Sequence, residues 1–217
     1  MDYDAFISYS HAARGRHASA VHAELQRLRP ERRRPARIFR DVTGLAFDPY
    51  MYATWSQRVR TRAEWRMLYA AMAGSKWFIL LASEEAAQSV AVNREVRYWL
   101  ETKSISRLVV ITTQAGHRSN PAGVRVARTA LPPALRDRVH ELTSIVAVDA
   151  NVDGRTTRRK LRRSLRPIAA AIFDETPESI ARLHPTLVPG QLSTWPTGWV
   201  RRATPPMRTR ASHDLSR

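Results

Sequence analysis

The sequence has 217 residues, enough for one principal domain with an appendage. Its composition, 43% hydrophobic and 25% charged, is typical of a globular protein rather than a disordered chain. The absence of cysteine excludes a disulfide framework, a zinc–thiolate or iron–sulfur centre and a cysteine nucleophile. Apolar runs are shorter than the roughly 18 residues that span a bilayer, and the acidic start is unlike a signal peptide. We therefore expect a cytoplasmic protein with no membrane partner.

The charge balance is strongly basic. Lysine and arginine number 36 against 19 acidic residues, which gives a formal net charge of +17. Seven basic residues lie within 27–40 and seven within 155–166. This clustering is compatible with nucleic-acid binding, whose affinity would fall steeply with salt. Because only three of the basic residues are lysine, the bias is also explained by a GC-rich coding genome, and we do not expect nucleic acid as the partner.

The first third of the chain predicts two strands and two helices. Residues 3–9 are aromatic and β-branched, as is typical of a strand. Apolar residues then recur at helical spacing over 17–29, and a short strand is predicted at 38–41. A loop with glycine and proline follows at 42–49, and 51–73 is mainly helical.

The middle of the chain predicts two buried strands around one helix. Residues 77–82 and 108–112 are continuously apolar, as strands buried on both faces of a parallel sheet are. Between them, Ser83 offers an N-cap to a single helix that continues to about Glu101.

The remaining pattern completes an α/β fold. An irregular stretch at 114–136 precedes a fifth strand at 144–148 and a basic helix at 156–173. Strands that alternate with helices predict a five-stranded parallel sheet with helices on both faces. Apolar periodicity ends at Asp174, so we expect a domain over 1–173 that folds alone and a weakly ordered, proline- and arginine-rich tail over 174–217.

Catalytic groups are expected in the loops that follow the strands, because open parallel sheets bind ligands beyond the carboxyl ends of their strands. None of these loops carries a glycine-rich phosphate motif, and the seven histidines never fall three or four residues apart. We therefore expect no metal site and no bound cofactor.

Glu95 is the carboxylate that the pattern singles out. Val92, Val96 and Trp99 form a buried stripe by their spacing, and Glu95 lies at its edge. Two readings stay open: a solvent-facing partner for neighbouring arginines, or a partly desolvated group aimed into the cleft at the strand ends.

Four segments, in order, resemble the Toll/interleukin-1 receptor (TIR) domain family. Residues 3–10 resemble its first signature box, and 37–45 resemble its second strand and BB loop. Residues 77–83 resemble its third strand with the serine that follows, and 92–100 are similar to the αC helix of bacterial TIR proteins. The resemblance spans about residues 1–173 and implies a flavodoxin-like α/β fold.

The resemblance also implies an activity and site residues. Glu95 matches the catalytic glutamate of bacterial TIR proteins that hydrolyse NAD+ to nicotinamide and ADP-ribose or a cyclic form. By the same resemblance Ser8, Ser10 and Asp41 would shape the substrate pocket. Two arginines that suit a pyrophosphate are Arg14 and Arg40.

The family also implies contacts with other TIR domains. The interaction loop would be Gly44, Leu45, Ala46 and Phe47, and association into a homo-oligomer would activate the enzyme. The alternative is a non-catalytic interaction module, because the family's usual tryptophan four residues before the glutamate is Ala91 here.

Overall fold

Residues 2–11, 16–30, 33–40, 62–112, 126–148 and 155–182 are described by the structure, which is a computed structural model. Within these ranges five parallel strands form one sheet in the order β2-β1-β3-β4-β5. The strands are β1 (Tyr3–Ser8), β2 (Ile38–Arg40), β3 (Ser75–Ala82), β4 (Leu108–Thr112) and β5 (Ile145–Ala147). The predicted flavodoxin-like α/β fold is confirmed, since each strand pairs in parallel with its neighbour.

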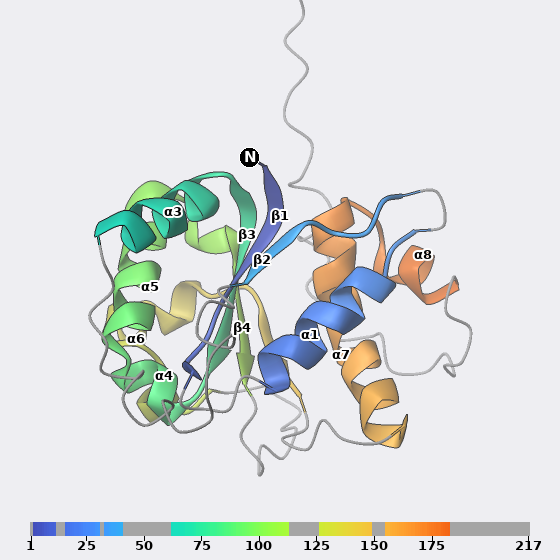
Figure 1. The fold of residues 1–217 in the computed structure, drawn as a ribbon. Helices are drawn as coiled ribbons and strands as arrows, with labels where there is room; N and C mark the ends of the chain where they lie inside the picture. The colour runs from blue at the N-terminus through green and yellow to red at the C-terminus, as the bar shows by residue number, and fades with distance from the viewer. Residues whose placement is uncertain are drawn as a thin grey trace, which may run out of the picture. The chain divides into compact units, whose positions relative to one another are not determined.

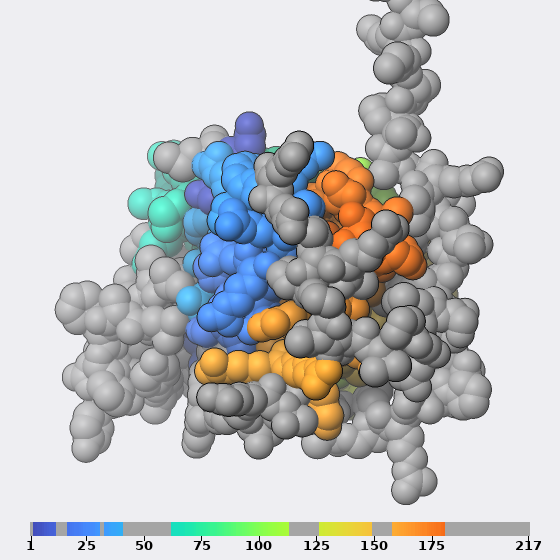
Figure 2. All heavy atoms as spheres, turned by 90° about the vertical axis from the view of Figure 1, so that its right-hand side faces the viewer, coloured from blue at the N-terminus to red at the C-terminus, as the bar shows by residue number. Residues whose placement is uncertain are grey.

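Helices cover both faces of this sheet, as Figure 1 shows. On one face lie α3 (Arg62–Ala73), α4 (Glu84–Gln88), α5 (Val90–Thr102) and α6 (Pro133–Arg136). The other face carries α1 (Arg16–Arg27), α7 (Arg155–Phe173) and α8 (Pro177–Arg182). Figure 2 looks onto this second face, where α1 and α7 lie side by side in direct contact. The described helices include none that is both long and apolar enough to span a membrane.

The strand sequences explain why the sheet needs both layers. In β3 every residue from Trp77 to Ala82 is buried, as is every residue of β4. Alternation sends Phe6, Phe78 and Val110 to the face covered by α3 and α5, where they pack in one core. Burial on both faces is what continuous apolar strands require.

The helix predicted from Ser83 to about Glu101 is two helices in the structure. The Ser83 hydroxyl caps α4 by accepting from the backbone of Ala86 at 3.1 Å, as predicted. The chain then leaves helical geometry at Ser89, whose hydroxyl accepts from the amide of Val92 and begins α5. The amide side chain of Asn93 donates to the carbonyls of Ala87 and Ser89. These side-chain hydrogen bonds replace the helical ones at the break, which the apolar periodicity does not reveal.

The ordered chain continues past the predicted domain end at Phe173. Asp174 adopts a left-handed conformation with φ of 54°, which ends α7. The chain then forms α8, whose Ile180 is fully buried. Two compact units are separated by their contacts, residues 1–187 and residues 188–217, and all described elements belong to the first.

Candidate functional site

The most distinctive polar contact in the sheet joins β1 to α5. The Ser8 hydroxyl donates a hydrogen bond of 2.7 Å to Oε2 of Glu95, and both side chains are buried. Glu95 is 4% exposed. A carboxylate is rarely buried unless it is paired, so its position must be stabilised by the contacts that surround it. The reading of Glu95 as a solvent-facing partner of neighbouring arginines is therefore wrong.

The sequence of α5 explains how the carboxylate reaches this place. Val92, Val96 and Trp99 form the buried stripe that their spacing predicts. Glu95 precedes Val96 on this buried side, and it points toward the sheet rather than toward water. The position four residues before it, Ala91, is partly buried against the same core.

Ser8 is the last residue of β1, so the pair lies at the carboxyl end of the strand. Ser8 alternates with the core residue Phe6 and faces the same side of the sheet. Parallel sheets gather their functional groups at this edge, because strand-exit loops meet there. The structure thus brings together two residues that the sequence proposed separately.

Thr112 is a residue of this edge that the sequence analysis missed. It ends β4, pairs with Ala82 and alternates with the core residue Val110. Its Oγ1 is buried, and no hydrogen-bond partner for it lies in the described part of the chain. A buried hydroxyl without a partner is costly. The signal was a polar residue that closes an otherwise apolar strand.

The other predicted pocket residues divide into two groups. Ser10 is buried two residues beyond Ser8. Arg40 lies elsewhere: its Nη1 donates to the Ser19 hydroxyl on α1, which covers the opposite face of the sheet from α5. Alternation along β2 explains this, because Phe39 takes the position toward the core and sends Arg40 to the other face. Arg40 is therefore not beside Glu95.

The remaining predicted residues lie outside the described residues. These are Arg14, Asp41 and the proposed interaction loop Gly44, Leu45, Ala46 and Phe47. Within the described ranges, no group of three or more metal-ligating side chains is placed to hold a metal ion.

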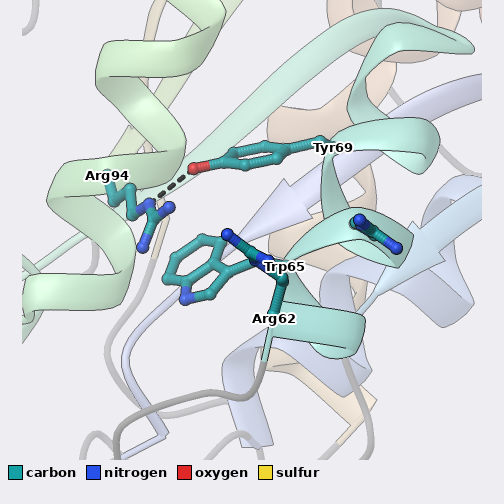
Figure 3. A pocket seen from close by; sticks show the side chains of 5 residues that line it. Arg62, Trp65, Tyr69 and Arg94 are labelled. Carbon is teal, nitrogen blue, oxygen red and sulfur yellow. Dashed lines mark hydrogen bonds between the residues drawn. The ribbon is translucent and has the colours of Figure 1, made fainter.

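A pocket between α3 and α5 was not foreseen. It is lined by Arg62, Trp65, Arg66, Tyr69 and Arg94, as Figure 3 shows. The available signal was a pair of aromatics four residues apart, Trp65 and Tyr69, each with an arginine three residues before it on the same helix.

The chemistry open to the Ser8–Glu95 pair follows from its surroundings. A carboxylate in a water-poor site interacts more strongly with a nearby positive charge than it would in solvent. The hydrogen bond from Ser8 restrains the carboxylate orientation, so little reorganisation is needed when a positive charge develops next to it. Such a site is suited to stabilising a cationic transition state.

Comparison with known proteins yields one informative relative. The chain is 44% identical over 141 residues to NAD(+) hydrolase ApTIR of an Actinoplanes species. The match covers 63% of this chain and 18% of the relative, so the chain spans less than a fifth of that protein's length. No family model and no solved structure matches the chain. The 44% identity to this TIR protein over 141 residues and the five-stranded parallel sheet both support the predicted resemblance of this chain to the bacterial TIR-domain family.

Proposed function

We propose that this chain is an NAD+ nucleosidase that cleaves the bond between nicotinamide and ribose, with Glu95 as its catalytic residue. The observation that carries the proposal is the buried carboxylate held by Ser8 at the carboxyl end of β1. The name of the relative, an NAD(+) hydrolase, supports the same activity.

The reaction requires little acid–base machinery. The bond between C1′ of the ribose and the pyridinium nitrogen breaks, and the bonding electrons leave with nicotinamide. Nicotinamide departs as a neutral molecule, so no general acid has to protonate it. Water then bonds to C1′ and releases a proton, which gives ADP-ribose. Attack by a nucleophile within the same nucleotide would give a cyclic form instead.

The role of Glu95 follows from the charge that develops on the ribose. As the bond breaks, the sugar gains oxocarbenium character, which a nearby carboxylate stabilises. One carboxylate is sufficient for this purpose. Ser8 acts as a positioning residue, because it contacts the carboxylate rather than the reacting bond.

The test is the release of nicotinamide from NAD+ by the full chain and by Glu95→Gln. Glutamine keeps the shape and can still accept the hydrogen bond from Ser8, but it carries no charge. Loss of one well-placed electrostatic group costs about a hundredfold to a thousandfold in rate, and we expect a loss of that size. The matched control is Glu101→Gln, which changes an exposed carboxylate on the same helix and should leave the rate unchanged.

We further propose that cleavage depends on self-association of TIR domains. The same assay, run at rising protein concentration, should then show a rate per molecule that increases with concentration. Equal cleavage by wild type and Glu95→Gln would remove the catalytic assignment. Absence of cleavage by both at every concentration would favour a non-catalytic interaction module.

A further inference from the structure

The pocket between α3 and α5 is separate from the Ser8–Glu95 pair. Its volume is about 440 Å³, and Glu95 does not line it. Among the described residues that line it, three are arginines, Arg62, Arg66 and Arg94, and none is acidic. The pocket therefore concentrates positive charge within a concave surface, and such a surface attracts anions.

These arginines are available for a ligand. Arg62, Arg66 and Arg94 are exposed, and none forms an ion pair with a carboxylate in the described part of the chain. The contrast with α1 is informative, because there Arg27 pairs with Glu24 at 2.7 Å. Like charges that share a pocket repel one another, and an anion between them would relieve the repulsion.

Arg94 is already held in place. Its Nε donates to the hydroxyl of Tyr69, and its guanidinium carbon lies 4.2 Å from the ring centre of Trp65. Figure 3 shows this side chain reaching from α5 toward the two rings of α3. Tyr69 itself is stacked against Trp65 at 5.5 Å and against Tyr98 at 4.4 Å. A guanidinium restrained in this way loses less conformational freedom when it binds a ligand.

The hydrogen-bonding capacity that remains on Arg94 indicates the ligand. The Nε of Arg94 is occupied by its hydrogen bond to Tyr69. The two terminal nitrogens of Arg94 have no acceptor among the described residues, so they can donate together to one anion. A planar pair of donors matches the oxygens of a phosphate. Trp65 is only 8% exposed, so its ring offers little free surface for stacking a nucleobase. A nucleotide in this pocket would therefore be recognised through its phosphate groups rather than its base.

The number of arginines and the volume favour more than one phosphate. Pockets for small molecules have volumes of about 300–1,000 Å³, so this one accommodates a diphosphate with an attached group. We propose that Arg62, Arg66 and Arg94 form a binding site for a pyrophosphate group, either free or within a nucleoside diphosphate. This site does not depend on cleavage of NAD+ at Glu95.

Calorimetric titration of the full chain with inorganic pyrophosphate tests the proposal. We expect saturable binding with one site, and weaker binding of inorganic phosphate. Arg94→Gln, and the double variant Arg62→Gln with Arg66→Gln, should each weaken pyrophosphate binding about tenfold or more. Arg97→Gln removes an exposed arginine one turn farther along α5, outside the pocket, and should leave the affinity unchanged.

Two further arms make the test specific. Tyr69→Phe keeps the aromatic ring but removes the hydroxyl that holds Arg94, and it should weaken binding severalfold. Titration with ADP distinguishes a nucleoside diphosphate from free pyrophosphate as the ligand. Tighter binding of ADP than of pyrophosphate would show that the site takes a nucleotide. Weaker binding of ADP would show that the site takes the free anion. Using Glu95→Gln protein in every titration keeps the result independent of catalysis. Absence of saturable pyrophosphate binding, or an equal loss in Arg97→Gln, would overturn the proposal.

Discussion

The hydroxyl of Ser8 restrains the orientation of the Glu95 carboxylate. The two side chains are 87 residues apart in sequence, and they meet through a hydrogen bond of 2.7 Å in a buried setting. A hydroxyl that donates to a buried carboxylate both satisfies one of its oxygens and fixes its direction. The pair should therefore behave as one unit in the proposed cleavage of NAD+.

We predict that Ser8→Ala lowers the rate of NAD+ cleavage about tenfold to a hundredfold, since a hydrogen bond to a charged group is worth about 1.5–3 kcal/mol. The measurement is nicotinamide release at saturating NAD+. Adding Ser8→Ala to Glu95→Gln should change the residual rate little, because Ser8 acts through the charge that is already lost. Full additivity of the two substitutions would show that Ser8 acts independently. Ser106→Ala, in an exposed turn, serves as the control.

His22 is a second residue whose environment matters, because it makes the stability of the fold depend on pH. Burial lowers the pKa of His22 below 6.5, and the positive charge of Arg40 lowers it further. Its Nε2 is buried, with no hydrogen-bond partner in the described part of the chain. A lowered pKa means that the unfolded chain binds the proton more readily than the folded one. The associated stability is present above pH 6.5 and is lost as pH falls through the lower, folded-state pKa.

We predict that this pH dependence disappears in His22→Gln, whose amide does not titrate. Urea unfolding of wild type and variant, at several pH values on either side of 6.5, measures the effect. The difference in free energy of unfolding, wild type minus variant, should increase as pH rises through the window below 6.5. A difference that stays constant with pH would contradict the assignment to His22.

At the scale of elements, Glu24 links α1 to the basic helix α7. Its carboxylate accepts from Arg27 on its own helix at 2.7 Å and from Nε of Arg162 on α7 at 2.8 Å, and it is 2% exposed. Positive charge is crowded on α7: burial lowers the pKa of Arg166, and its neighbours Arg163 and Arg162 lower it further. Glu24 offsets part of this repulsion where the two helices pack.

We predict that Glu24→Gln lowers the free energy of unfolding by about 1.5–3 kcal/mol, because hydrogen bonds to charged groups contribute about that much. Chemical denaturation of the full chain measures it. The matched control is Asp137→Asn in the pair with Arg128, where both partners are well exposed. Exposed pairs contribute little, and the control should change stability by less than about 0.5 kcal/mol. An equal effect of both substitutions would contradict a special role for the α1–α7 link.

At the scale of the whole molecule, α8 extends the folded unit beyond the end that the sequence indicated. Ile180 is fully buried, and α8 packs against α7. The first compact unit ends at Leu187. Removing α8 would expose the surface that Ile180 covers, whereas residues beyond 187 belong to a separate unit.

We predict that truncation after Leu187 leaves the free energy of unfolding unchanged and that truncation after Asp174 lowers it. Ile180→Ala in the full chain isolates the contribution of the buried side chain, and such substitutions cost about 2–5 kcal/mol. Thermal and urea unfolding of the full chain, the two truncated chains and Ile180→Ala measure the differences in free energy of unfolding. Equal stability of the two truncated chains would show that the domain is complete at Phe173.

Local sequence patterns determined the strands and the fold class. Strands β3 and β4 were predicted because continuous apolar runs of their length are buried on both faces of a parallel sheet. The stripe of Val92, Val96 and Trp99 was predicted because helical spacing determines which side chains share a face. Glu95 itself was singled out from its place beside that stripe and from the family resemblance.

Only the tertiary structure decided which distant residues meet. No periodicity reveals that Ser8 and Glu95 form a hydrogen bond, because that depends on strand order and on the packing of α5 against β1. The same holds for Arg40, whose direction follows from the pairing of β2, and for the pocket where Arg94 of α5 meets Trp65 of α3. Spacing along the chain determines faces and periods, whereas contacts between elements depend on how the whole sheet assembles.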